Sequence, residues 1–286
     1  MSEYQYYEFH TIDRALTQEE RAEINTWSSR STASATSVSF EYSYGSFSKD
    51  PEKVVLKYFD AMLYIANWGA RQIIFRFPEA LVEFDELKKY RYDDGNEYEC
   101  GIHIKRKGNY ILLIIRDHEE DGLGWIEEND SLVDMLPLRS NIIQGDYRVL
   151  YLAWLHFLSV SGENEEVEKD EEFLEIQEPP VPANFGRPNK ALDTLVDFFE
   201  MDSDLIKIAK QGSSEVPKVA NTNWRYLLTQ LSEKEKTAFL MQLIEGDIHV
   251  AHALKKRLVS LKPQKKQSSK NRRSRGEVLA LIEDIK

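Results

Sequence analysis

Residues 99–116 have the sequence ECGIHIKRKGNYILLIIR, the clearest β-strand pattern in the chain. β-Favouring residues on both sides of Gly108 predict two strands, at 99–107 and 109–116, that form a hairpin. Five consecutive apolar residues at 111–115 make the second strand apolar on both faces, which is typical of a strand inside a sheet. The stretch therefore predicts a sheet with this strand in its interior.

Three segments closer to the N-terminus are predicted to add strands. Residues 4–12 are aromatic and β-favouring, residues 37–44 alternate polar and apolar side chains, and residues 71–78 end at a proline. Helices are expected around them. Thr17 and Glu20 have capping-box spacing for a helix to about Ser29.

A second helix is expected to begin at Asp50 and Pro51, and apolar spacing extends it through Ala66 to a stop at Gly69. Further helices of this half are predicted over residues 79–90, 131–136 and 147–158. These elements predict an α+β domain over residues 1–161, with helices packed on a mixed or antiparallel sheet.

The composition changes over residues 162–189. Between Glu163 and Glu178 the chain has nine acidic residues and one lysine, and three prolines follow. Charge repulsion and proline stiffness favour an extended linker. Beyond it, helical periodicity over residues 190–261 predicts a small all-α domain, with a capping box at Ser232. One helix of this domain has an apolar face made by Phe239, Leu240, Leu243 and Ile244.

The last part of the chain is basic, whereas the chain as a whole is acidic. Thirty-seven Lys and Arg against 49 Asp and Glu give a net charge of −12, which disfavours phosphate binding by the chain as a whole. Residues 262–275 form a basic segment that we expect to be a flexible tail, before a C-terminal helix starts at 276–286. The basic residues of the tail are Lys262, Lys265, Lys266, Lys270, Arg272, Arg273 and Arg275. This tail is either a solubilising linker or a docking segment for nucleic acid or for an acidic protein surface, the chain's own acidic linker included.

Several classes of function are disfavoured by the sequence. One cysteine, Cys100, excludes an internal disulfide and a Cys-rich zinc module. No apolar stretch reaches the roughly 20 residues that span a bilayer, and the first residues do not form a signal peptide, so we expect a cytoplasmic chain with no membrane partner. No phosphate-binding loop or nucleophile elbow is present, and we expect no cofactor.

Histidines offer weak candidates for chemistry. His249 and His252 share a helix face, as two metal ligands would, but no further ligand is evident and we expect no metal. Cys100 and His103 are an odd number of residues apart, which places their side chains on opposite faces of a strand. An enzyme would need a pocket with a carboxylate beside His103, His118 or His156. We predict no catalytic residue.

Aromatic residues are concentrated in the first quarter of the chain. Tyr and Trp suit interfaces as well as cores, because one end of each side chain tolerates water. Most of them are expected to pack on the sheet. The residues predicted to contribute to a partner-binding surface are Tyr4, Tyr6, Tyr7, Tyr42, Tyr44 and Trp68.

The segments MSEYQYYEF at residues 1–9 and YFDAMLYIANWG at 58–69 resemble a family of bacterial cytosolic proteins without assigned activity. The resemblance covers about the first eighty residues. It implies an α+β domain followed by helices and a charged coiled-coil extension, and it implies no catalytic residues. The chain is also similar to accessory proteins encoded beside protease-containing type III CRISPR effectors, which act through protein complexes.

These features together predict a non-catalytic interaction, scaffold or regulatory protein of a bacterial cytosolic complex, with other proteins as partners. Three alternatives stay open at this point. They are an accessory protein of a CRISPR-associated defence system, a nucleic-acid-binding accessory that acts through the basic tail, and an enzyme of unrecognised type.

Overall fold

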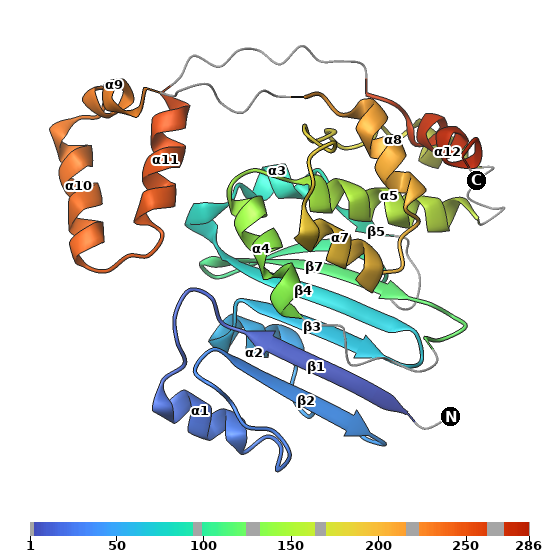
Figure 1. Cartoon of the computed structure of the whole chain (residues 1–286), viewed down its shortest axis with the longest axis horizontal. Helices are drawn as coiled ribbons and strands as arrows, with labels where there is room; N and C mark the ends of the chain where they lie inside the picture. The colour runs from blue at the N-terminus through green and yellow to red at the C-terminus, as the bar shows by residue number, and fades with distance from the viewer. Residues whose placement is uncertain are drawn as a thin grey trace. The chain divides into compact units, whose positions relative to one another are not determined.

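The computed structural model describes residues 3–93, 99–123, 132–163, 170–215, 223–261 and 272–285. The chain forms two compact units, one of Met1–Ser214 with Arg273–Lys286 and one of Glu215–Arg272. The first, called the body, is α+β (Figure 1), which confirms the predicted fold class. Its seven-stranded antiparallel sheet has the order β2-β1-β3-β4-β7-β6-β5. The strands are β1 Tyr4–His10, β2 Ser37–Ser43, β3 Ala61–Ala66, β4 Ala70–Pro78, β5 Tyr92–Asp93, β6 Gly101–Lys107 and β7 Tyr110–His118.

The predicted hairpin is confirmed. β6 and β7 pair from Gly101 with Arg116 to Lys107 with Tyr110, around a turn in which Gly108 has a φ of 60°. β7 also pairs with β4, so it lies inside the sheet as predicted. Residues 111, 113 and 115 are buried in one apolar cluster, and residues 112 and 114 are buried in the other. The five-residue apolar run therefore contributes to both faces of the sheet.

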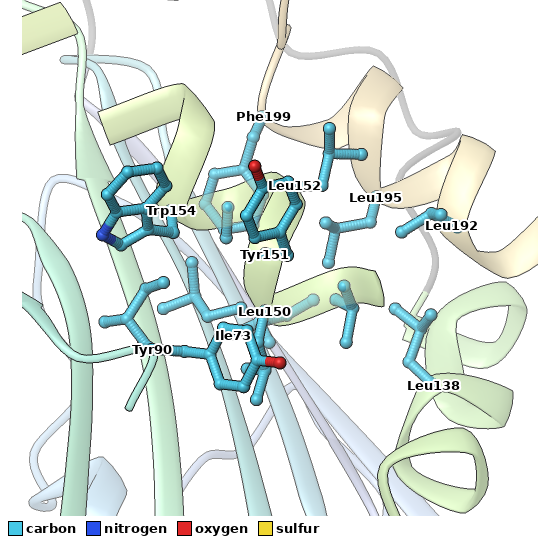
Figure 2. Close-up of a cluster of buried hydrophobic side chains, with 14 of the residues drawn as sticks. Ile73, Tyr90, Leu138, Leu150, Tyr151, Leu152, Trp154, Leu192, Leu195 and Phe199 are labelled. Carbon is cyan, nitrogen blue, oxygen red and sulfur yellow. The ribbon is translucent and has the colours of Figure 1, made fainter. Parts of the chain in front are cut away.

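Helices cover both faces of the sheet (Figure 1). On the larger face lie η1 Glu79–Leu81, α3 Phe84–Lys88, α4 Leu132–Ile143, α5 Arg148–Gly162, α7 Lys190–Phe198 and α8 Asp204–Gly212. In α5, twelve consecutive residues are buried, and Figure 2 shows Tyr151 and Trp154 of this helix in one cluster with Leu195 and Phe199. On the other face, α1 Gln18–Asn25 and α2 Pro51–Tyr58 bury a second cluster rich in aromatic rings.

The predicted helix over residues 51–66 is wrong in its second half. α2 begins at the predicted cap, where Asp50 accepts from the N–H groups of Glu52 and Lys53, but it ends at Tyr58. Residues 61–66 instead form β3, which pairs with β1 and β4. A strand buried on both faces is apolar at nearly every position, so its pattern also satisfies helical spacing. Gly69 marks the β3–β4 turn, where a Cβ would lie 1.9 Å from the Glu119 carbonyl oxygen.

Other predicted helices differ in extent. The helix expected over residues 79–90 is divided into η1 and α3, and α4 continues past Pro137 to Ile143. The acidic linker is not wholly extended, because residues Glu171–Glu175 form α6 and the side chain of Glu178 is buried. Residues 164–169 lie outside the described part of the chain.

The division into compact units also differs from the predicted domain boundary. Helices α7 and α8 were expected in the C-terminal domain, but Leu195, Leu205 and Ile208 are buried in the same cluster as α5. α12 Arg275–Glu283 joins this cluster through Val278 and Ile282, although little was expected to pack against it. Helical periodicity predicts that an apolar face must be covered, but it does not specify which element covers it. The second unit is therefore an insertion within the body.

Hydrogen bonds among Tyr151, Glu178 and Arg273 hold the chain where it returns to the body, and we call this cluster the clasp. The guanidinium of Arg273 donates to both oxygens of buried Glu178, at 3.0 Å from Nε to Oε1 and 2.8 Å from Nη2 to Oε2. Tyr151 donates to the same carboxylate at 2.7 Å, and the Glu178 N–H donates to the Arg273 carbonyl. A Cβ at Gly212 would lie 2.9 Å from Nη2 of Arg273, so the outgoing and returning segments run close together. This clasp contradicts a flexible tail at Arg273.

A buried charge network joins the strands to the helices. Asp60, immediately before β3, is fully buried and accepts from the N–H groups of Ile12 and Asp13 at 2.6 and 2.8 Å. Arg76 of β4 donates to Asp60 at 2.7 Å, and Arg139 of α4 binds Asp13 through both terminal nitrogens. Although burial raises the pKa of Asp60, the charges of Arg76 and Arg139 and the two N–H donors hold it below its usual value.

We expect Asp60→Asn to lower the free energy of unfolding of the body by about 3–5 kcal/mol, because Arg76 would stay buried without its counter-charge. Since the pKa of Asp60 is depressed, its contribution is complete above about pH 5 and is lost as the pH falls below its ordinary value of 3.8. Urea unfolding as a function of pH measures both effects. The stability of the variant should depend less on pH below about pH 4.

The control for this variant is Asp134→Asn, which breaks a surface pair with Lys190. We expect it to change stability by less than about 1 kcal/mol. An equal loss of stability in the two variants would contradict a special role for Asp60.

We also expect the body to fold without the insertion. In a variant with residues 215–272 replaced by a short Gly-Ser linker, the body should keep a cooperative thermal transition, because the clasp and both sheet faces belong to the body. Circular dichroism and calorimetry measure this. Adding Glu178→Gln to the deletion should lower the melting temperature, because Arg273 loses its charged acceptor. A deletion variant without a cooperative transition would contradict the assignment.

Candidate interaction surface

Among its described residues, the inserted unit, called the insert, contains three helices: α9 Trp224–Thr229, α10 Glu233–Ile244 and α11 Val250–Ser260 (Figure 1). Local capping explains where two of them begin. The side chain of Asn223 accepts from the Tyr226 N–H at the start of α9. At the start of α10, Ser232 and Glu235 form the predicted capping box.

The core of the insert is small. Leu227, Leu231 and Leu258 are buried, and they are flanked by the half-buried side chains Phe239, Leu254 and Leu261. One ion pair joins two of its helices, with Arg257 Nε of α11 donating to Glu235 of α10 at 2.8 Å. Such a core stabilises a unit of this size only marginally, because small domains bury a low fraction of their apolar surface.

Apolar side chains are unusually exposed in the insert. Of the fifteen exposed large apolar side chains in the described part of the chain, nine lie between Trp224 and Val259. α10 buries none of its residues. Leu240, Leu243 and Ile244 are 59%, 60% and 77% exposed, and Ile248 just beyond the helix is 60% exposed. The first three are spaced as neighbours on one helix face, and we call them with Ile248 the α10 stripe.

The apolar helix face predicted from the sequence is present in α10, and most of it is exposed. Of the four residues on this face, Phe239 packs against the core of the insert. Leu240, Leu243 and Ile244 are exposed. The sequence signal for this exposure is the small number of apolar residues that α9 and α11 provide to cover the face.

The insert is also basic within an acidic protein. Residues 215–272 contain twelve Lys and Arg and five Asp and Glu, a net charge of +7, whereas the rest of the chain has 25 basic and 44 acidic residues. Three of the basic residues, Lys255, Lys256 and Arg257, follow one another in α11. The insert therefore combines exposed apolar side chains with positive charge, and this combination suits an acidic protein surface.

No protein-family model, curated protein or solved structure matches this chain. No helix in the described ranges is long and apolar enough to cross a membrane.

The six predicted partner-binding aromatics do not form one surface. Tyr6 and Tyr7 are adjacent in β1 and pack in different clusters on opposite faces of the sheet. Tyr7 is buried, stacks on Tyr64 and lies edge-on to half-buried Tyr42. Tyr4 is half-buried, and its N–H donates to Asn67. Tyr44 is 75% exposed with a φ of 62°, and Trp68 is 39% exposed in the β3–β4 turn.

The seven predicted basic residues also separate. Lys262, Lys265, Lys266 and Lys270 lie outside the described residues. Arg272 is exposed, whereas Arg273 belongs to the clasp. The guanidinium of Arg275 lies over the rings of Tyr92 and Phe173, at 5.1 and 4.3 Å from their centroids. At least two of the seven residues thus pack within the body.

The histidines do not form a metal site in the described residues, where no cluster of three or more His, Cys, Asp or Glu side chains occurs. His103 Nε2 lies 2.8 Å from the Glu99 carbonyl oxygen, and Cys100 is buried. His156 Nε2 lies 2.9 Å from Asp117 Oδ2, which is the carboxylate contact required of an enzyme site. The other oxygen of Asp117 accepts from the His118 N–H, so both oxygens of this carboxylate are already hydrogen-bonded.

We expect the insert to lose protection at acid pH through Glu235. This carboxylate accepts hydrogen bonds from the Ser232 hydroxyl, the Ser232 N–H and Arg257, which lower its pKa from 4.5 to about 2. The stabilisation is complete above pH 4.5 and is lost as the pH falls towards 2. Hydrogen exchange over residues 223–261, measured by mass spectrometry, should show this change.

Glu235→Gln should abolish most of this pH dependence, because the side chain no longer titrates. Glu245→Gln, at the exposed C-terminal end of α10, is the matched control and should retain it. An identical pH profile in the Glu235→Gln variant and the unaltered chain would contradict the assignment.

Proposed function

We propose that this chain is an interaction protein whose insert docks an acidic segment of another protein through the α10 stripe. The observation that carries the proposal is the exposure of the stripe in a unit with only four buried apolar residues among those described, Leu227, Leu231, Val250 and Leu258. Contiguous apolar surface of this kind is typical of protein–protein interfaces, because its burial is the main source of affinity.

The positive charge of the insert favours an acidic partner. A net charge of +7 attracts an acidic surface, whereas the acidic body repels one. Apolar side chains in the centre of an interface with complementary charges around them are the usual arrangement of a specific protein contact. The expected partner segment is therefore amphipathic, with apolar residues opposite the stripe and Asp or Glu around them.

A protein partner fits better than nucleic acid. The aliphatic side chains of Leu240, Leu243 and Ile244 gain little from phosphates, whereas the apolar residues of a protein segment can bury them. The basic residues outside the described part of the chain leave phosphate binding as an outcome for the experiment to test. The body would act as the scaffold that holds the insert at both ends.

The resemblances noted in the sequence are compatible with this role. An accessory protein of a CRISPR-associated defence complex would act through such a contact, and that assignment stays a prediction.

The test compares full-length chains in affinity capture from extracts of the source cells, at low and physiological salt, with and without nuclease treatment. We expect Leu240→Gln/Leu243→Gln/Ile244→Gln to weaken partner binding about a hundredfold or more, because each side chain contributes roughly 1–2 kcal/mol when buried. Glutamine favours helices, so α10 should persist, which circular dichroism checks. Binding measured with the purified partner gives the affinity.

Val160→Gln is the matched control, since this apolar residue of α5 is 51% exposed in the body. It should retain the partner. Equal capture by the triple variant would overturn the proposal, as would capture that disappears with nuclease treatment. If light scattering shows a dimer that the triple variant lacks, the partner is a second copy and the acidic partner is wrong.

A further inference from the structure

An open hollow lies in the body on the sheet face that carries the aromatic-rich cluster. Its volume is about 550 Å³, and its lining includes Glu3, Gln5, Tyr7, Tyr64 and Trp68. Tyr7 of β1 lies directly opposite Tyr64 of β3, and both pack in that cluster. Side chains two residues apart in a strand share a face, so Gln5 lies on the same face as the two tyrosines. One ligand can therefore contact all three residues.

The aromatic wall of the hollow is held in place by the fold. Tyr7 is buried and stacks on Tyr64, with 4.5 Å between the ring centroids. Trp68 is 39% exposed and lies in the β3–β4 turn. The Asn67 carbonyl oxygen in this turn accepts from the Leu123 N–H at 3.0 Å. The rings are thus positioned before any ligand binds, which lowers the cost of binding.

Polar groups of the lining already bond to one another. The Tyr7 hydroxyl donates to Gln5 Oε1 at 3.1 Å, and Gln5 Nε2 donates to the Gly45 carbonyl oxygen. Two oxygen acceptors of the hollow are therefore already engaged. A ligand that enters meets ring surface and few acceptors for hydrogen bonds of its own.

The charge of the hollow favours a cation. Among the described residues of its lining, the one charged side chain is Glu3, which is exposed. Arg116 lines an adjoining cavity, but its guanidinium donates to Glu99 at 2.8 Å. Arg71 pairs with Ile65 and so lies on the other face of the sheet. The body is also strongly acidic as a whole.

The tyrosines contribute to this preference as neutral rings. Burial raises the pKa of Tyr7 and of Tyr64, so both phenols stay protonated at physiological pH. The face of a neutral aromatic ring attracts a cation through its quadrupole, and tryptophan attracts most strongly. Several rings beside one carboxylate are the usual composition of a site for an organic cation.

We propose that this hollow binds the quaternary ammonium head of an organic cation. The head contacts Trp68 and Tyr64, and Glu3 supplies the opposite charge. A primary ammonium would exchange its hydrogen bonds to water for few protein acceptors, whereas a fully methylated one donates no hydrogen bonds and loses none. A choline-type headgroup and a trimethylated lysine side chain share this chemistry. The hollow belongs to the body and does not depend on the insert or its partner.

The test is titration calorimetry on the full-length chain with choline, 3,3-dimethylbutanol and ethanolamine. The alcohol has the shape of choline without the charge, and ethanolamine has the charge without the methyl groups. We expect choline to bind at least about fivefold more tightly than either. Equal affinity for the neutral alcohol would overturn the cation, and equal affinity for ethanolamine would overturn the methylated head.

Two further probes distinguish the sources of the ammonium group. Tighter binding of phosphocholine than of choline supports a headgroup, and tighter binding of N-acetyl-trimethyllysine amide supports a modified protein side chain. If neither these two compounds nor choline binds, the proposal is wrong.

Substitution of Trp68 tests the ring contact. Trp68→Ala should weaken choline binding at least about fivefold, and Trp68→Phe should retain most of the affinity. Trp224→Ala is the matched control, because this tryptophan is 41% exposed in the insert, and it should leave the affinity unchanged. Thermal unfolding checks that each variant is folded. An unchanged affinity in a folded Trp68→Ala variant would contradict the contact.

Glu3→Gln tests the charge. It should weaken choline binding about two- to threefold and leave binding of the neutral alcohol unchanged, because only the charged probe loses an attraction. Misfolding would weaken both probes. Glu41→Gln is the matched control: Glu41 is also exposed, but it pairs with Tyr6 and so lies on the other face of the sheet. An equal effect of the two substitutions on choline would rule out a specific role for Glu3.

Discussion

The carboxylate of Asp60 is the constraint on which the body depends. It has no exposed surface, and its hydrogen bonds connect the chain after β1 with Arg76 in β4, while Arg139 attaches α4 to the same network. Arg139 also donates to the Arg76 carbonyl oxygen, and Arg76 donates to the Leu56 carbonyl oxygen in α2. Elements on both faces of the sheet are therefore positioned by one group of charges. Apolar burial supplies most of the stability, whereas this network specifies which elements meet.

The clasp marks the boundary between the body and the insert. Glu178, Tyr151 and Arg273 bring together residues that are up to 122 positions apart in the sequence. Their contacts hold α12 against the larger apolar cluster and return the chain to the body after the insert. The body and the insert consequently differ in character: the body is acidic with two extensive cores, and the insert is basic with a minimal one.

Sequence reasoning succeeds here where the determining residues are close together. The β6–β7 hairpin follows from Gly108 and its flanking residues, and the capping boxes at Thr17 and Ser232 form as predicted. It fails for β3, because an interior strand and a buried helix have similar apolar patterns. It also fails for α7 and α8, because the residues that cover their apolar faces are distant in the sequence. Of the candidate surface, the apolar face of α10 was visible in the sequence. Its exposure was not, because exposure depends on how few other helices are available to cover it.

The clasp has a thermodynamic effect on the insert. While the body is folded, both ends of residues 215–272 are held near each other, so an unfolded insert is a closed loop instead of a free chain. Closing a loop of about 60 residues removes conformational entropy equivalent to about 4 kcal/mol near 25 °C in the chain-entropy treatment of cross-links. That amount is comparable with what a core of three leucines provides. The insert can therefore leave much of its apolar surface uncovered and stay folded, because the body has already restricted the alternatives open to its chain.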